Sequence, residues 1–551
     1  MLSAKFRLVK NLVYFASFSL LLTGLDSCQK PPPLVPILPI IPINPVPPLV
    51  GDQRDSLRDI AKFYYYWNYN IASSFNPLSY DLYIASADSS PVLEAIKLYS
   101  PLNSVNNLHY DHFSFLLTEA QYVSDFGTGH TLPSFGMHFA QDINGVFRVS
   151  YVAQASPAYN QGVRRGFAVT AINGIPLNTT TTNAQFATLN GIISGTVPAS
   201  FTVTNPATST NSTINIATGV FGDDEVITTK VLQSGSKTIG YIAYNTFLTS
   251  LTAKMEVVHP GLDSAFAGLA AKGITDLIVD LRYNGGGYVS IAEQMDNAML
   301  PQSVDGKIMY SQTYNDSLNF YHKNYNNGKN QIAHDTLVYI NEKDPANPTH
   351  LNLNNVVFIV SSGTASAAEL VINDIKPYFA NLKIVGLGKG LTGIATRSAG
   401  KPFGYAYNFG LPTATKTVPS TYEAFIINFE SKNGLGQDDY VSGFIPDDQE
   451  YDGVEYNWGD PNEYGFMAAY NFLSKGTFQV SSKNSILALN GISRSGNNYP
   501  IHVGGPLLGI GHHFQGMLMG PKKGISQKIR NSELQKARIA VGKQMIRGKI
   551  K

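Results

Sequence analysis

Ser366 stands at a point in the sequence where a hydroxyl could act as a nucleophile. It belongs to "SSGTASAAEL" (361–370), which follows the apolar run "NVVFIV" and precedes residues with helical apolar spacing. We expect a strand that ends near Val360 and a helix that begins near Ser366 and stops at Pro377. The free N–H groups and the positive dipole end of such a helix would stabilise a developing oxyanion, as acyl transfer requires.

The same serine has a simpler interpretation as a helix cap. Ser366 and Glu369 form the Ser-x-x-Glu pattern of a capping box, in which the serine hydroxyl accepts an amide N–H and the glutamate reaches back. Taken alone, these letters favour the cap over the nucleophile.

Two glycine-rich stretches bear on this choice. "DLRYNGGGY" (280–288) places three glycines after a predicted strand, where the backbone can approach a ligand without a Cβ in the way. "KIVGLGKGLTG" (383–393) places Lys389 between glycines after another strand. A lone lysine in such a loop is usually a solvated cation, so Lys389 by itself indicates nothing.

Taken in order, "LRYNGGG", "TASAAE" and "GKG" resemble the motifs of the C-terminal processing (tail-specific) serine endopeptidases, a Ser-Lys dyad family. "GFIPDD" (443–448) and the "GDPNE" helix start are similar to the sequence that follows the dyad in these proteins. The resemblance covers residues 51 to about 475. It implies a peptidase core that is an α/β sheet with covering helices.

The resemblance also implies roles for individual residues. Ser366 would be the nucleophile and Lys389 the general base, with oxyanion donors from the backbone N–H groups of Gly287 and Ala367. Glu369 matches the family's acidic residue three positions past the serine. A basic Lys389 must be neutral, so its pKa must fall from about 10.4 towards 7, a change worth roughly 4 kcal/mol.

This chain departs from the family pattern near the lysine. The loop before Lys389 is about three residues shorter than in family members, and the positions of a third polar residue fall on Gly393 and Pro377. Asp374 could substitute for it, but the sequence favours a surface acid on the helix. A catalytically degenerate protein that binds peptides or another ligand is therefore the alternative.

Residues 133 to 217 read as short strands with turns. "SPAYNQGVRRGFAVTAING" resembles a PDZ domain of the bacterial protease type, although Gly166-Phe167 replaces the usual Gly-Asp. PDZ domains bind an extended C-terminal peptide by strand addition. The alternative is a β-rich spacer. The resemblance implies that the peptide would bind along Phe135, Gly136, Met137, His138 and Phe139.

The N-terminus resembles that of a bacterial lipoprotein. Three basic residues precede a short apolar run, and "LDSC" ends it, which indicates an export signal over 1–27 and lipidation of Cys28. Residues 31–50 are rich in proline and predict an extended spacer. We therefore expect a lipid-anchored protein of the bacterial cell envelope, on the periplasmic side or the cell surface.

A further expectation concerns the fold class and the domain organisation. The predicted fold class is α/β and multidomain. Its parts are a linker (28–50), a helical domain (51–125), a PDZ-like β-rich domain (130–220), an α/β peptidase core (225–476) and an extension with a basic tail (477–551).

Composition limits the partners. With 40 Lys and Arg against 39 Asp and Glu, no basic field favours nucleic acid. Cys28 is the single cysteine, and His512 and His513 lack a carboxylate at metal-ligand spacing. We expect polypeptide substrates and no metal or other cofactor.

Overall fold

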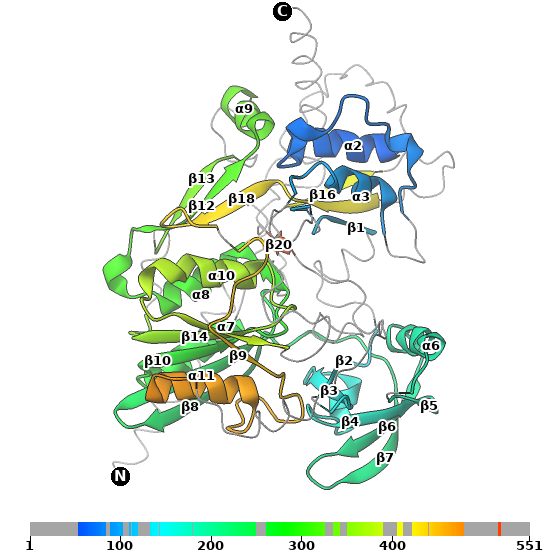
Figure 1. The fold of residues 1–551 in the computed structure, drawn as a ribbon, viewed down its shortest axis with the longest axis vertical. Coiled ribbons are helices and arrows are strands. Elements are labelled where there is room, and N and C mark those ends of the chain that lie inside the picture. Colours follow the sequence, from blue (N-terminus) through cyan, green and yellow to red (C-terminus); the bar gives the residue numbers. More distant parts are fainter. Residues whose placement is uncertain are drawn as a thin grey trace, which may run out of the picture. The chain divides into compact units, whose positions relative to one another are not determined.

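The computed structural model describes residues 53–83, 89–102, 109–111, 113–118, 133–142, 144–178, 180–248, 260–325, 334–341, 350–388, 405–410, 421–438, 440–478 and 516–518. Cys28 and Lys389 lie outside these ranges, as does the basic tail. Figure 1 labels the helices and strands.

A six-stranded sheet in the order β19-β15-β14-β10-β9-β8 forms the centre of the fold. Neighbouring strands are parallel, except that β8 pairs antiparallel with β9. Parallel strands bring their carboxyl ends to one edge, so the turns after β10, β14 and β15 share that edge. The strands are β8 (Val226–Ser234), β9 (Lys237–Tyr244), β10 (Asp276–Asp280), β14 (Asn355–Val360), β15 (Lys383–Leu387) and β19 (Asp448–Glu450).

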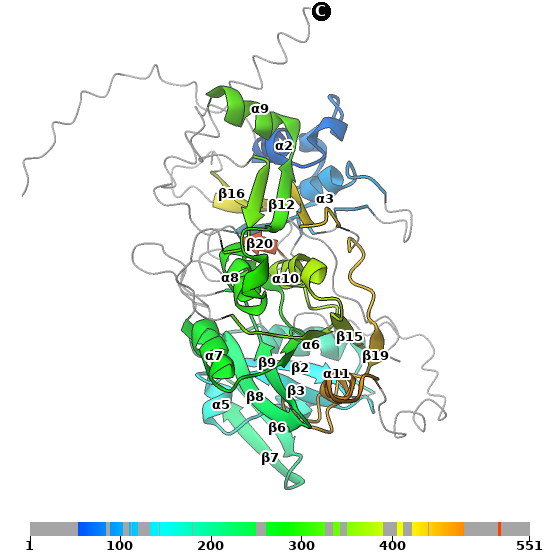
Figure 2. The ribbon, with the colours of Figure 1, turned by 90° about the vertical axis from the view of Figure 1, so that its left-hand side faces the viewer.

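Helices cover both faces of this sheet, as Figures 1 and 2 show. One face packs on α7 (Pro260–Ala271), α8 (Val289–Met299) and α10 (Ala367–Ile375), and the other on α11 (Tyr464–Lys475). In β14, Val356, Phe358 and Val360 join the first core, whereas Val357 and Ile359 join the second. A strand buried on both faces needs apolar residues at every position, which explains the unbroken run "NVVFIV".

A separate β-rich unit has its own hydrophobic core. Its strands follow the order β2-β3-β4-β6-β7, with β5 paired to β4, so β2 is an edge strand. The elements are β2 (Met137–Gln141), β3 (Phe147–Val152), α5 (Pro157–Asn160), β4 (Ala168–Ile172), β5 (Ile175–Pro176), α6 (Asn183–Ile193), β6 (Ala199–Asn205) and β7 (Thr210–Ile216).

The remaining described elements form smaller sheets and short helices. The sheets are β1-β17-β16, β13-β12-β18 and β11-β20. Their strands are β1 (Phe115–Thr118), β11 (Gly286–Tyr288), β12 (Ile308–Tyr314), β13 (Thr336–Tyr339), β16 (Tyr405–Gly410), β17 (Thr421–Ile426), β18 (Phe429–Asn433) and β20 (Gly516–Leu518). The helices are α2 (Gln53–Tyr64), η1 (Asn68–Asn70), η2 (Pro77–Ser79), α3 (Pro91–Lys97), η4 (Gln302–Val304), α9 (Asp316–Tyr325) and η5 (Lys376–Tyr378).

The structure is a mixed α/β fold with several sheets, as the sequence predicts. The segment predicted to be helical contains α2 and α3, but it also contributes strand β1, which pairs with β17. The boundaries between domains stay predictions. Within the described ranges, no helix is both long enough and apolar enough to span a bilayer.

A buried ion network ties the end of β10 to the start of α11. The Arg282 guanidinium pairs with Asp280 Oδ2 at 2.7 Å and donates to both Glu463 carboxylate oxygens at 2.9 Å. Glu463 is also the N-cap of α11 and accepts the N–H of Phe466 at 2.7 Å. A buried carboxylate is tolerable here because Arg282 and the helix N-terminus both satisfy it.

The network makes stability sensitive to acid. Burial raises the pKa of Glu463, but Arg282 and the Phe466 N–H outweigh it and lower the pKa from 4.5 to about 2. The carboxylate therefore stabilises the fold above pH ~4.5, and this contribution is lost as the pH falls towards 2. A shift of that size corresponds to about 3 kcal/mol.

We predict that Glu463→Gln lowers the free energy of unfolding at pH 7 by about 3–5 kcal/mol, because Arg282 keeps its charge but loses a partner. The acid-induced loss of stability between pH 5 and 2 should also shrink. Urea unfolding across that pH range measures both effects. The control is Glu94→Gln, on a carboxylate whose side chain is 57% exposed. An acid dependence equal to that of the wild type in Glu463→Gln would contradict this account.

Candidate active site

The turn between β14 and α10 is bonded to the turn that follows β10. Thr364 Oγ1 donates to the Leu281 carbonyl at 2.6 Å, and Ser361 Oγ donates to the Arg282 carbonyl. The Ala365 N–H donates to the Asn284 carbonyl at 3.0 Å. Two of the hydroxyl residues in "SSGTAS", Ser361 and Thr364, therefore satisfy buried backbone carbonyls and hold the two turns together.

Ser366 has a backbone conformation that serine rarely adopts. Its φ is 59° and its ψ is −117°, immediately before α10 begins. Such a conformation costs about 1–3 kcal/mol for a residue with a Cβ and persists only where the surroundings impose it. A serine on a sharp, strained strand-to-helix turn is also the arrangement that presents a nucleophilic Oγ in other hydrolases. The strained backbone of Ser366 therefore favours a nucleophilic role over a purely structural one.

The structure also bears on the capping interpretation. The glutamate half of the capping box is present, because Glu369 Oε2 accepts the Ser366 N–H at 3.0 Å. The Ser366 Oγ is buried and has no hydrogen-bond partner among the described residues. The glutamate thus fixes the serine backbone, while the hydroxyl is not used as a cap.

The triglycine turn lies against Ser366. Gly286 has a φ of 107°, and a Cβ built on it would come within 2.6 Å of Ser366 Cβ and 3.0 Å of the Ala367 nitrogen. Gly287 has a φ of 143°, and a Cβ there would lie 2.3 Å from the Phe247 carbonyl carbon. Only glycine fits at either position.

Asn284 holds the triglycine turn in place. This fully buried side chain accepts the Gly286 N–H at 2.9 Å and donates to the Tyr244 carbonyl at 3.0 Å. Beyond it, Phe247 bonds to the Gly286 carbonyl and to the Tyr288 N–H. The Gly287 N–H consequently points away from Phe247, to the side on which β20 pairs with β11, so in the described structure it faces that strand.

Ala367 supplies the second predicted oxyanion donor. It is the first residue of α10, so its N–H has no acceptor within the helix, and the described residues provide none elsewhere. Its nitrogen is the one that lies close to Gly286. The structure therefore brings the triglycine turn, Ser366 and the open N-terminus of α10 together, as stabilisation of an oxyanion requires.

The predicted base is not part of the described structure. Strand β15 pairs with β14 with Gly386 opposite Val360 and ends at Leu387, at the same sheet edge as the Ser366 turn. Lys389 comes two residues after Leu387 but lies outside the described residues, so the Ser-Lys pairing stays a prediction.

Asp374 is not the surface acid that the sequence favours. It lies on α10 and is fully buried, and both of its carboxyl oxygens lack a hydrogen-bond partner among the described residues. The sequence interpretation was wrong because α10 packs on α8 and β18 as well as on the sheet, so most of its circumference is covered. Its position on the last turn of α10 also separates it from Ser366.

The predicted peptide-binding segment lies along the start of β2. Phe135, Met137, His138 and Phe139 are all buried, and Gly136 has a φ of 74°. A Cβ on Gly136 would lie 2.1 Å from Ser156 Cβ. Phe135, Met137 and Phe139 belong to the core of the β-rich unit, whereas the His138 ring packs on Tyr151 outside that core. The backbone of the edge strand is therefore the part of this segment that is available for pairing.

Several predicted features are untested by the described residues. Cys28 and the histidine pair His512 and His513 lie outside them. Across the described part of the chain, no group of three or more His, Cys, Asp or Glu is arranged to hold a metal ion.

Sequence reasoning missed the residues that support the site. Asn284 directly precedes the three glycines. An Asn next to a glycine turn could have been recognised as a residue that fixes the turn, because its side chain can form hydrogen bonds to the nearby backbone. Asp296 on α8 is also fully buried, and its carboxyl oxygens have no hydrogen-bond partner in the described part of the chain. The position of Asp296 in the sequence does not indicate that this residue is buried.

Comparisons with known proteins bear on the segment that contains Ser366 and on the fold. Residues 238–404 match the model of peptidase family S41. No curated protein matches the sequence. A structure of a Bacteroides fragilis protein assigned to the S41 proteases aligns with a TM-score of 0.54 at 18% identity, over 77% of this chain and 97% of that one.

Two other solved structures align with lower scores. The photosystem II D1 C-terminal processing protease gives a TM-score of 0.40 at 16% identity, over 76% of this chain and 97% of its own. The structure of mature CPAF complexed with lactacystin gives a TM-score of 0.38 at 9% identity, over 80% of this chain and 97% of that one. The segment that carries the triglycine turn and Ser366 thus matches peptidase family S41, within a fold shared with the Bacteroides fragilis protein.

Proposed function

We propose that this protein is a serine endopeptidase in which Ser366 is the nucleophile. The observation that carries the proposal is the strained Ser366, whose Oγ has no hydrogen-bond partner among the described residues and which packs against Gly286 at the open N-terminus of α10. A structural cap would use its hydroxyl and would need no positive φ. A nucleophile needs a free hydroxyl beside preorganised N–H donors.

The proposed chemistry is acyl transfer. Ser366 Oγ attacks the scissile carbonyl as Lys389, the proposed base, takes its proton. The N–H groups of Gly287 and Ala367 hold the negative charge on the carbonyl oxygen. The peptide nitrogen leaves with the proton from Lys389, and water then hydrolyses the acyl-enzyme.

The proposed substrates are polypeptides that bind through a C-terminal end. Strand β2 is the open edge of the β-rich unit, so an extended peptide can add to it by main-chain hydrogen bonds. The positive φ of Gly136 turns the backbone just before β2, in the region where a PDZ domain would hold the terminal carboxylate. Anchoring in the bacterial envelope through lipidated Cys28 belongs to the same proposal.

We predict that Ser366→Ala reduces peptide cleavage by about 1,000-fold or more, because only binding and the oxyanion donors would be left. The measurement uses the chain without residues 1–50 and a denatured peptide library, with products identified by mass spectrometry. Ser362→Ala, in the same turn, is the control and should retain cleavage. Cleavage that persists in Ser366→Ala would refute the assignment. Saturable peptide binding without cleavage by the wild type would favour the degenerate binding protein.

We also predict that Gly286→Ala lowers kcat on the order of 100-fold or more, because the new Cβ must displace Ser366 or Ala367. KM should change little, since the substitution leaves the β2 edge intact. Gly268→Ala on α7 is the matched control, because a Cβ there meets nothing within 4 Å. Equal kcat values for the two variants would show that the triglycine turn does not support the reaction.

A further inference from the structure

Two acidic side chains are buried between the helices that begin at the candidate site. Asp296 lies on α8 and Asp374 on α10, and both are fully buried. None of their four carboxyl oxygens has a hydrogen-bond partner among the described residues. Ordinary buried acids are bonded or paired, so this arrangement requires an explanation.

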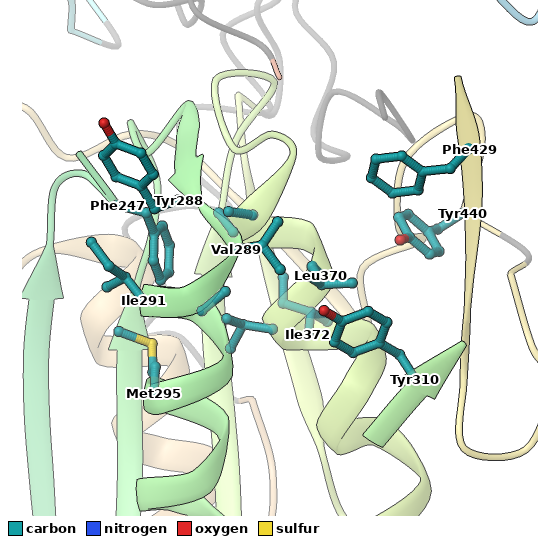
Figure 3. Close-up of a cluster of buried hydrophobic side chains, with 14 of the residues drawn as sticks. Phe247, Tyr288, Val289, Ile291, Met295, Tyr310, Leu370, Ile372, Phe429 and Tyr440 are labelled. Carbon is teal, nitrogen blue, oxygen red and sulfur yellow. The ribbon is translucent and has the colours of Figure 1, made fainter. Parts of the chain in front are cut away.

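The two acids lie at similar depth below the site. Asp296 follows Val289, the first residue of α8, by seven residues, and Asp374 follows Ala367, the first residue of α10, by seven, which at 1.5 Å per residue is about 10 Å along each helix. Figure 3 shows α8 and α10 side by side, with Met295 of α8 and Ile372 of α10 in one apolar cluster. One end of each helix thus meets the site, while the acids lie further along.

The groups that act on the pair are acidic or phenolic. Burial raises the pKa of Asp296 well above its usual range, and the charge of Glu293 adds to this. Burial also raises the pKa of Asp374 strongly, with further increases from Asp296 and Glu293. Among the described residues, no lysine, arginine or histidine offsets these effects.

Phenols surround the acids on the other packed elements. Tyr310 of β12 donates to Glu293 Oε1 at 2.6 Å, which occupies that carboxylate. Burial raises the pKa values of Tyr378 in η5 and of Tyr440 after β18. The charge of Asp374 raises both further, after that of Glu369 in the case of Tyr440, so both phenols lie within the electrostatic reach of Asp374. Figure 3 shows Tyr310 and Tyr440 beside α10. The pair therefore lies in an environment that favours neutral carboxyl groups.

We propose that Asp296 and Asp374 act as a protonated carboxyl pair that sets the packing of α8 on α10, and so positions Gly287 and Ala367 around Ser366. Both are positioning residues, since neither touches the reacting atoms. Neutral carboxyl groups can stay inside the helix interface. Ionisation would place like charges there without partners and separate the helices.

The proposal rests on the proposed peptidase function for its effect on rate. Deprotonation of the base makes the rate rise with pH, and ionisation of the pair makes it fall again at higher pH. Beyond that point, a single inactivating ionisation lowers kcat about tenfold per pH unit. KM should be little affected, because the pair is remote from the β2 edge.

The test compares pH–rate profiles of Asp296→Asn, Asp374→Asn and the double variant with that of the wild type. We expect the variants to keep kcat at pH 7.5 within about threefold and to lose the alkaline decrease, because an amide cannot ionise. Asp316→Asn, on the exposed first turn of α9, is the control, and this variant should keep the alkaline decrease. An alkaline decrease unchanged in all three variants would overturn the proposal.

A second measurement does not depend on activity. An acid whose pKa is raised by folding loses stabilisation as pH rises above about 4, so the Asn variants should gain melting temperature over the wild type with rising pH. Infrared absorption of protonated carboxyl groups at pH 7.5 should be present in the wild type and absent from the double variant. If no cleavage occurs but both signals appear, the peptidase proposal fails and the protonated pair stands. If the wild type lacks the infrared signal, the pair is ionised and the positioning proposal fails.

Discussion

The close approach of Gly286 to Ser366 is the constraint on which the rest of the site depends. A Cβ on Gly286 would clash with the Ser366 Cβ, and Gly286 has a positive φ, so this close approach of the two turns requires glycine at position 286. Hydroxyl-to-carbonyl bonds from Ser361 and Thr364 hold the turns in contact. The central sheet places the two turns next to each other, because the parallel strands β10 and β14 end at one edge.

Buried ionisable side chains lie on two sides of the contact between Gly286 and Ser366. Towards α11, Arg282 and Glu463 satisfy each other and anchor the chain just before the triglycine turn. Between α8 and α10, Asp296 and Asp374 have no such partners within the described ranges. The first arrangement stabilises the fold at neutral pH, whereas the second costs stability there unless both groups keep their protons. Strain at Ser366 adds a further cost, and such costs are typical of places where a protein gives up stability for function.

Much of the fold is predictable because the signals are local. The apolar run of β14, the small residues after it and the Pro377 stop predict the strand, turn and helix in which Ser366 lies. The burial of Asp374 is not predictable in this way, because it depends on α8 and β18, which are remote in sequence. The capping box shows the same limit. Its letters predict the Glu369 bond correctly, but they do not predict the positive φ of Ser366 or the lack of a hydrogen-bond partner for its hydroxyl among the described residues. The family resemblance adds the roles of Gly287 and Ala367, which no local pattern carries.

The reactivity of Ser366 tests the central claim most directly. The wild-type chain without residues 1–50 is treated with a fluorophosphonate, and the modified residue is located by mass spectrometry. A nucleophilic Ser366 predicts one phosphonyl adduct, on Ser366 and not on Ser361, whose hydroxyl is engaged with the Arg282 carbonyl. The labelling rate should rise with pH through neutrality as the base loses its proton. A Ser366 that stays unmodified in a folded protein would contradict the account.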